Sequence, residues 1–381
     1  MDFKLSDEQL AVSEAATGIF SGLVDAERIA AVEGGIERID RELWQALASA
    51  DLLGLAVPEA DGGAGYGLME LCLLLQAQGN AVAPVPLWST LVLGALPLAH
   101  FGSEAQRAGW LPGVVAGEVI LTAALTGSAH SPTSMPSVRA SASGDGWRVD
   151  GTELAVPHAH LADRIVLPAR TADGGVLVVL LDPAAPGVTL ERATTTNREI
   201  HPHLHVAGVT VAPADVLVGP EAGRPALTFV QVAATTALCA LQVGVCEAAL
   251  SRTAAYLNGR QQFGRPLSTF QGTMLRAADA AIDIEAMRVT WQNAAWRFDT
   301  GRDATDAARV AKWQASERGQ RTVHATQHLH GGMGADISYP IHRYFLWGKQ
   351  IELLLGGPSA QLAKLGADIA EQALARAEAT A

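Results

Sequence analysis

The order in which hydrophobic periodicity changes along this chain is the feature that most constrains its fold. Residues 1–118 repeat apolar positions at helical spacing, residues 119–220 alternate like strands, and residues 221–381 return to long helical patterns. Long helices pack best as an antiparallel bundle. The order predicts an α+β fold with an N-terminal helical domain, a middle β-domain and a C-terminal helical bundle. Long helices are expected at 225–256, 267–300, 304–330 and from 344 to the end.

Local signals add finer expectations. Ser6, followed by Asp7 and Glu8, is expected to cap the first helix. The glycine-rich run at 61–65 is expected to form a flexible loop between helices. Strands are expected at 147–152, 164–168 and 176–181, where alternation or short apolar runs lie between Gly, Pro and Asp.

Composition excludes several classes of function. The chain has 381 residues, 49% of them apolar, and a net charge of −12. Its 27 basic residues are scattered, whereas nucleic-acid binding needs clustered Lys and Arg. The first ten residues are acidic and amphipathic and lack the basic and apolar blocks of a secretory signal, so we expect a cytoplasmic protein.

The cysteines and the apolar stretches are expected to belong to the core. Cys72, Cys239 and Cys246 lie alone in apolar helical patterns without metal-ligand spacing, so no metal site is expected. The apolar stretch 81–99 contains three prolines, and 225–246 is interrupted by Thr and Gln. Both are expected to be buried in the protein and not to span a membrane.

Four motifs, in this order and at these separations, carry a family resemblance. They are LSDEQL at 5–10, LGLAVPE at 53–59, RQQFG at 260–264 followed by Phe270-Gln271, and HLHGGMG at 328–334 followed by Tyr339-Pro340 and Arg343-Tyr344. Together they resemble the acyl-CoA dehydrogenases over essentially the whole chain. The resemblance implies a C-terminal four-helix bundle, assembly as a dimer of dimers, and FAD at a subunit interface.

In that family one subunit holds the flavin ring and the catalytic base, and its neighbour reaches over to the pyrophosphate and adenosine. The residues that would serve a neighbour's FAD match well: Arg260 resembles the arginine that pairs with the pyrophosphate, because its fixed fork of donors suits phosphate oxygens. Phe263 resembles the aromatic residue beside the cofactor, and Gln271 the polar residue further on. Gly331 and Gly332 would let backbone approach the dinucleotide.

One position in this half departs from the family. The family usually has Gln three residues before the glycine pair, where this chain has His328, with Gln327 displaced by one residue. One residue rotates a side chain by about 100° around a helix, so the role of His328 stays open. His330 is expected to be either a packed helix-end residue or a ligand contact.

The residues that would serve the chain's own flavin match poorly. The family's Leu-Thr-Glu-Pro-Gly run corresponds to Leu125-Thr126-Gly127-Ser128, which keeps Thr126 as a flavin contact but replaces Glu with Gly127. The aromatic-Ile-Thr segment behind the flavin ring corresponds to Val156-Pro157-His158. Near the C-terminus, Ser359 and Gln361 are expected to touch the cofactor.

The catalytic base is missing from its usual places. Desaturation of a thioester removes an α-proton while a hydride leaves Cβ for the flavin, which needs a glutamate over the α-carbon. The family's usual glutamate position is occupied by Leu355, and the alternative position on the preceding long helix, counted back from Arg260, by Ala234. Glu352 and Glu247 are the nearby acids that would have to substitute.

The leading hypothesis is a subunit that does not itself catalyse desaturation. It would pair with a paralogous, base-bearing subunit in an α2β2 heterotetramer, donate half of the FAD site, and act on a bulky acyl-CoA such as a steroid derivative. Electron-transfer flavoprotein or an equivalent acceptor would reoxidise the complex. The alternatives are a self-sufficient dehydrogenase with a relocated glutamate, a flavin monooxygenase or oxidase derived from the family, and a scaffold without flavin.

Overall fold

The N-terminal region is helical, as expected. The computed structural model describes residues 3–130 and 134–380. Ser6 caps the first helix, because its hydroxyl accepts the Gln9 N–H at 3.2 Å while the Gln9 side chain accepts the Ser6 N–H at 3.1 Å. The helices are α1 (Asp7–Leu23), α2 (Ala26–Gly34), α3 (Arg41–Ser49), α4 (Leu68–Ala81), the π-helix η3 (Trp88–Ala95), α5 (Leu96–Phe101) and α6 (Glu104–Val115).

The expected loop at 61–65 is present, and it is closely packed at one residue, Gly63. It follows two short 3₁₀-helices, η1 (Leu52–Gly54) and η2 (Glu59–Asp61). The Gly63 N–H donates to the Pro58 carbonyl at 3.1 Å, and a Cβ at Gly63 would lie 2.2 Å from the Val57 carbonyl oxygen. Gly63 therefore serves close backbone packing, because a larger residue would clash with Val57.

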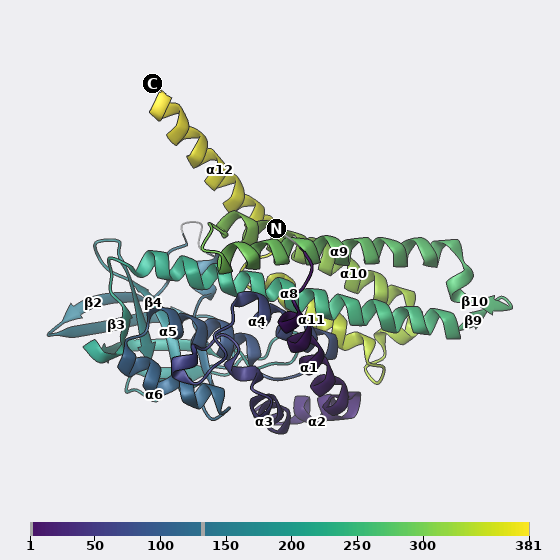
Figure 1. The fold of residues 1–381 in the computed structure, drawn as a ribbon, viewed down its shortest axis with the longest axis horizontal. Coiled ribbons are helices and arrows are strands. Elements are labelled where there is room, and N and C mark those ends of the chain that lie inside the picture. The colour runs from purple at the N-terminus through teal and green to yellow at the C-terminus, as the bar shows by residue number, and fades with distance from the viewer. Residues whose placement is uncertain (1–2, 131–133, 381) are drawn as a thin grey trace.

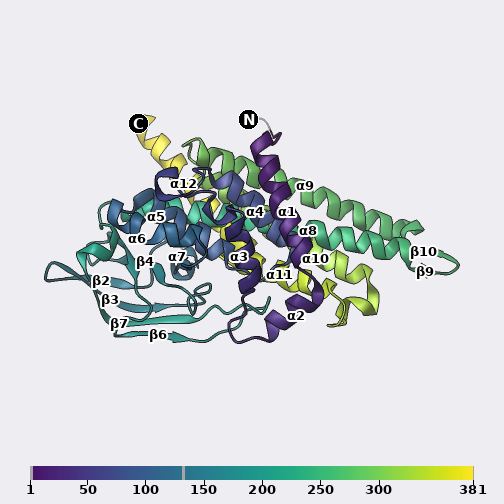
Figure 2. The same cartoon turned by 60° about the horizontal axis from the view of Figure 1, so that its bottom comes forward.

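The middle region is one eight-stranded sheet with the order β6-β7-β3-β2-β4-β5-β8, and β1 pairs with β4. The three expected strands are present as β3, β4 and β5. Neighbouring strands β2, β3, β7 and β6 lie side by side in Figure 2. The strands are β1 (Leu121–Ala123), β2 (Arg139–Ser143), β3 (Gly146–Glu153), β4 (Arg164–Arg170), β5 (Val176–Leu181), β6 (Val188–Glu191), β7 (His203–Val211) and β8 (Val216–Val218), with the short helix α7 (Thr126–His130) after β1.

The C-terminal region is the expected helical bundle, so the α+β fold class is confirmed. Figure 1 shows α8, α9 and α10 running along the long axis and α12 pointing away from the body. Two glycines let α8 approach α4 closely, because a Cβ at Gly79 or Gly244 would lie 2.2 or 1.9 Å from a backbone carbonyl oxygen of the other helix. The helices are α8 (Gly223–Gly259), α9 (Gln271–Asp299), α10 (Thr305–Leu329), α11 (Ile341–Leu353) and α12 (Pro358–Thr380).

Helix α8 is a core element. Among the described residues it alone has the length and hydropathy of a membrane span, and 89% of its most apolar window is buried inside the protein. Such burial is typical of the central helix of a bundle. The three cysteines are free and buried, as a core role requires.

The expected continuous helix from 344 to the end is interrupted, and that prediction was wrong. Helix α11 ends at Leu353, and α12 begins at Pro358. Between them Leu355 and Gly356 adopt left-handed backbone angles, with φ of 56° and 95°. The last carbonyls of α11 accept hydrogen bonds from the buried Lys312, whose Nζ lies 2.8 Å from the Ile351 oxygen and 3.0 Å from the Glu352 oxygen.

Candidate functional site

Arg260 and Phe263 lie at the far end of the bundle, on a hairpin that leaves α8 (Figure 1). Strands β9 (Gln261–Gln262) and β10 (Arg265–Pro266) form the hairpin. Phe263 is at its tip with a left-handed φ of 52°, and 91% of its surface is exposed. No carboxylate of the described residues lies within ion-pair distance of Arg260. A free guanidinium and an exposed ring suit a ligand or a partner.

Ring stacking brings the glycine motif next to this hairpin. Tyr256, one turn before Arg260, stacks on His330 with ring centroids 4.5 Å apart, and Tyr339 packs on the same imidazole at 5.3 Å. His330 is only 2% exposed, and its Nδ1 hydrogen-bonds the Thr326 carbonyl at 2.8 Å. His330 is therefore the packed helix-end residue of the two expectations, and it ties the end of α10 to the end of α8.

The glycines of this motif are not explained by the chain's own packing. They open the 3₁₀-helix η6 (Gly331–Ala335). Gly331 has a left-handed φ of 59°, which favours glycine, whereas the φ of Gly332 is not left-handed. A Cβ at either position would meet no atom within 4 Å. Gly332 is exposed. Because no described residue would contact a Cβ at Gly332, the space beside this backbone is open to another molecule.

His328 and Gln271 complete this end of the bundle. His328 is exposed and lines a cavity of about 770 Å³ between α9 and α10, together with Arg276, Arg321 and Asp279. Gln271 is the first residue of α9 and is exposed. Gln327 points elsewhere: its Oε1 is buried without a partner. His328 therefore faces outward at this end of the bundle, whereas the Gln327 amide oxygen does not.

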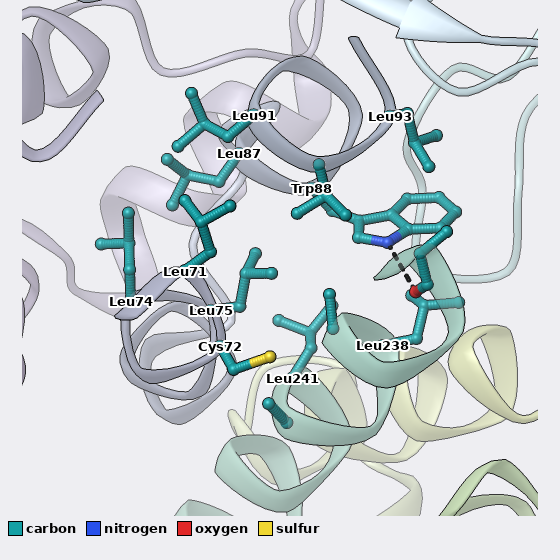
Figure 3. Close-up of a cluster of buried hydrophobic side chains, with 14 of the residues drawn as sticks. Leu71, Cys72, Leu74, Leu75, Leu87, Trp88, Leu91, Leu93, Leu238 and Leu241 are labelled. Carbon is teal, nitrogen blue, oxygen red and sulfur yellow. Dashed lines mark hydrogen bonds between the residues drawn. The ribbon is translucent and has the colours of Figure 1, made fainter. Parts of the chain in front are cut away.

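Ala234, the alternative position expected for the base, lies against a tryptophan. Ala234 on α8 is fully buried, and its carbonyl accepts a hydrogen bond from Trp88 Nε1 at 3.1 Å. Figure 3 shows the Trp88 ring of η3 among leucines from α4, η3 and α8, with the hydrogen bond dashed. Leu238 and Leu241, one and two turns after Ala234, belong to the same cluster. The space near Ala234 is packed side chain.

Leu355, the usual position expected for the base, lines a cavity of about 520 Å³ between α7, α8, α10 and α12. Its side chain contributes to the cavity wall and is 6% exposed. Gln361 is 4% exposed and donates from Nε2 to the Leu355 carbonyl at 2.8 Å, so this amide braces the loop. Ser359 is exposed near the start of α12.

Two carboxylates that sequence reasoning missed also line this cavity. Asp368 and Glu371 lie on α12 and face it together with Arg224, Arg309 and Lys364. Asp368 is ion-paired with Arg309, and Glu371 is exposed. No sequence motif pointed to them, because only the fold brings this part of α12 beside the start of α10.

Gly127 has a structural reason within this chain. Its N–H donates to Glu153 Oε2 at 2.8 Å, and the Ser137 hydroxyl also hydrogen-bonds this carboxylate. A Cβ at Gly127 would lie 2.6 Å from Glu153 Oε1. Glu153 is 1% exposed, and burial raises its pKa. Thr126 is half-buried beside this pair. The Gly127 N–H is thus already hydrogen-bonded within the protein.

The segment Val156-Pro157-His158 is also internally satisfied. All three residues are buried, and the Pro157 carbonyl accepts the Thr122 hydroxyl at 2.6 Å. His158 Nδ1 lies 3.0 Å from the Ser89 hydroxyl of η3, and its Nε2 lies 3.9 Å from Glu199. Burial lowers the pKa of His158 to about 4, so the imidazole is neutral at pH 7.

Glu247 and Glu352, the two acids considered as substitutes for the base, are engaged in other contacts. Glu247 is ion-paired with Arg288 and accepts a hydrogen bond from Gln76 Nε2 at 2.9 Å. Glu352 pairs with Lys349 at 2.5 Å. Neither acid lines the cavity beside Leu355. Both contacts are those of structural ion pairs.

The fold and these motifs define a class of protein, and comparison with known proteins identifies it. The model described as acyl-CoA dehydrogenase, N-terminal domain matches residues 6–118, and the one described as acyl-CoA dehydrogenase, C-terminal domain matches residues 233–370. The chain belongs to the acyl-CoA dehydrogenase family.

Three relatives place it more closely. Acyl-CoA dehydrogenase FadE27 of Mycobacterium tuberculosis is 38% identical over 344 residues, which cover 88% of this chain and 90% of that protein. The solved structure of the steroid ACAD Tcur3481-Tcur3483 has a TM-score of 0.91 at 47% identity, covering 97% of this chain and 99% of the other. The ChsE4-ChsE5 complex from Mycobacterium tuberculosis has a TM-score of 0.90 at 36% identity, with the same coverage. Both structures are named for two different proteins.

Proposed function

We propose that this chain is a non-catalytic subunit that lends half of a flavin site to a paralogous acyl-CoA dehydrogenase subunit in an α2β2 complex. The single observation that carries the proposal is that an apolar residue occupies both positions expected for the base. Leu355 lines the cavity, and Ala234 lies against Trp88. Neither position offers a carboxylate to accept the α-proton, and of the two acids on α12 that line the cavity, Asp368 is ion-paired with Arg309 and Glu371 is exposed.

The residues at the hairpin end fit FAD bound by another subunit. Arg260 would pair with the pyrophosphate, Phe263 would pack beside the cofactor, and Gln271 and His328 would offer polar contacts. Gly331 and Gly332 would allow backbone contact, which agrees with the open space around both. When bound, FAD supplies a hydride acceptor to the complex.

The residues of the chain's own flavin half do not fit the cofactor equally well. The Gly127 N–H is bound to Glu153, and Pro157 offers no hydroxyl. Of the three residues expected to contact the cofactor here, Thr126 is half-buried, Gln361 is hydrogen-bonded to the Leu355 carbonyl, and Ser359 is exposed. We infer one shared FAD for each pair of unlike chains, in a cytoplasmic complex.

The substrate we propose is a bulky acyl-CoA of the steroid type. Support comes from the relative named as a steroid ACAD, which covers 97% of this chain at 47% identity. The electron acceptor we propose is electron-transfer flavoprotein or an equivalent.

Counting flavins tests the proposal. The chain is coexpressed with its paralogous subunit, and FAD is released from the purified tetramer and quantified against total chains by absorbance. Two FAD per four chains is the expected result, and the isolated chain should be colourless and inactive. Four FAD per tetramer, or desaturation by the isolated chain, would contradict it and favour the self-sufficient dehydrogenase.

A further inference from the structure

A cavity of about 460 Å³ lies between the N-terminal helices α1, α2 and α4 and the bundle helices α8 and α11. The described residues that line it are all different from those that line the cavity beside Leu355. Its volume lies within the range of about 300–1,000 Å³ that is typical of small-molecule sites. We call it the Arg252 cavity. Its buried lining is largely apolar and includes Phe20, Ile29, Ala77, Val82 and Tyr344.

Arg252 of α8 lines this cavity, and a buried tyrosine holds its side chain. Arg252 Nε donates to the Tyr344 hydroxyl at 2.9 Å, and the guanidinium carbon lies 5.3 Å from the centre of the Tyr344 ring. Tyr344 is 2% exposed, and its hydroxyl donates to the Asn80 carbonyl at 3.1 Å. No carboxylate of the described residues lies within ion-pair distance of Arg252. The guanidinium is therefore held in position without a counter-charge.

The other charged side chains at the cavity already have partners. Arg343 is 6% exposed, and its Nε lies 3.1 Å from Glu33 Oε1. Asp25 caps α2, because its carboxylate accepts the Arg28 N–H at 2.8 Å. Among the lining residues that the structure describes, the positive charge of Arg252 is thus left without a balancing group. A ligand that matches the cavity carries one negative charge.

Val82 shows backbone strain at the wall of this cavity. It ends α4 with a left-handed φ of 45°, and its N–H donates to the Gly79 carbonyl at 3.2 Å. Glycine is the usual residue in this conformation, which is costly for a β-branched side chain. Strain of this kind persists where the surrounding structure needs the side chain. Val82 is 2% exposed and lines the cavity, so a glycine would relieve the strain but remove part of the apolar wall.

We propose that the Arg252 cavity binds a small carboxylate with an apolar body, of the kind of a medium-chain fatty acid. The carboxylate would pair with Arg252, because the planar fork of a guanidinium matches the two oxygens of a carboxylate. The apolar body would lie against Phe20 and Ile29. A CoA thioester matches the cavity less well, because it has no free carboxylate and would bring several phosphate charges to one unpaired arginine.

The test is isothermal titration calorimetry of the purified full chain with octanoate. We expect one octanoate for each chain. Arg252→Gln should weaken binding at least about 10-fold, because a charge-assisted hydrogen bond is lost. Octanamide has the same length without the charge, so it should bind more weakly than octanoate and equally well to the chain and to Arg252→Gln. Arg252→Lys keeps the charge but not the fork and should give an intermediate affinity.

The matched control is Arg224→Gln. Arg224 is also exposed and also lacks a carboxylate partner among the described residues, but it lines the cavity beside Leu355. This change should leave octanoate binding as it is. Octanoate binding that depends on Arg224 and not on Arg252 would place the ligand in the other cavity and overturn the proposal. Absence of saturable binding at millimolar octanoate would also overturn it.

The apolar wall has a test of its own. Val82→Gly accepts the left-handed backbone and removes the isopropyl group, so it should weaken octanoate binding by about 5-fold. Circular dichroism checks that each variant is folded, and an unchanged affinity in folded Val82→Gly would reject the apolar part of the site. The titration uses the chain without flavin or partner, so its result is independent of the flavin count that tests the proposed function.

Discussion

The hairpin end of the bundle and the centre around Leu355 use their polar groups in opposite ways. At the hairpin end Arg260 has no carboxylate partner among the described residues, and Phe263 is almost fully exposed. At the centre, Trp88 Nε1 is bonded to the Ala234 carbonyl and the Gly127 N–H to Glu153. Groups left unpaired at a surface are available to another molecule, whereas groups paired inside the chain have become part of its core.

On the proposed function, this difference is what a chain that keeps half of a shared site would show. The half that contacts a neighbour's cofactor would keep its donors free. The half that would hold the chain's own flavin could fill with side chains, and each filled position would stabilise the fold. Four experiments test this difference between the two regions.

The largest effect is expected at Trp88. Trp88→Ala should destabilise the chain by about 3–5 kcal/mol, because the change removes a buried indole and leaves the Ala234 carbonyl without its donor. Urea unfolding of the isolated chain measures it, and Trp88→Phe, which keeps most of the ring, should cost less. The FAD content of the complex should not change; a third or fourth FAD in Trp88→Ala would show that the ring merely blocks a working site.

The next effect is expected at Arg260. Arg260→Ala should weaken FAD binding to the complex by about 10- to 150-fold, because a charge-assisted bond to phosphate contributes about 1.5–3 kcal/mol. Equilibrium dialysis of FAD with the preassembled complex measures the affinity. Arg41→Ala, at an exposed arginine paired with Glu37, is the control and should change nothing. Full FAD affinity in Arg260→Ala would remove the hairpin end from the cofactor site.

A pH effect of about 2 kcal/mol is expected at His158. Its pKa falls from 6.5 to about 4 on folding, so the unfolded chain binds a proton between these values and the folded chain does not. The stabilisation is present above pH 6.5 and is lost as pH falls toward 4, by about 2 kcal/mol between pH 7 and pH 5. His158→Gln should reduce this loss in urea unfolding, whereas the exposed His324→Gln should not. An unchanged pH dependence would mean that His158 is solvated.

The smallest effects are expected at the remaining acids. Glu352→Gln, Glu247→Gln, Asp368→Asn and Glu371→Gln should each change the desaturation rate of the complex by less than about 2-fold, because on the proposed function the base belongs to the other subunit. Steady-state kinetics with an acyl-CoA and an electron-accepting dye measure the rate. A loss of 100-fold or more at any of them, with folding intact, would identify a relocated base.

Much of the architecture could be predicted from the sequence. The α+β order follows from periodicity, which depends on local spacing alone, and Ser6 caps α1 because its partner Gln9 is three residues away. The close packing of Gly63 within the loop at 61–65 and the break at 354–357 could not be predicted in the same way. The packing of Gly63 on Val57 and the support of α11 by Lys312 both depend on residues brought together by folding.

From the sequence alone follow the family scaffold, the arginine, phenylalanine and glycines of the hairpin end, and the presence of Leu355 and Ala234 where the family resemblance leads one to expect glutamate. The folded structure adds that Trp88 donates to the Ala234 carbonyl, that Glu153 accepts from the Gly127 N–H, and that Asp368 and Glu371 line the cavity beside Leu355. The physical reason is distance along the chain: Trp88 and Ala234 are 146 residues apart. A motif records which side chains are present, but their partners are chosen by the packing of helices and strands.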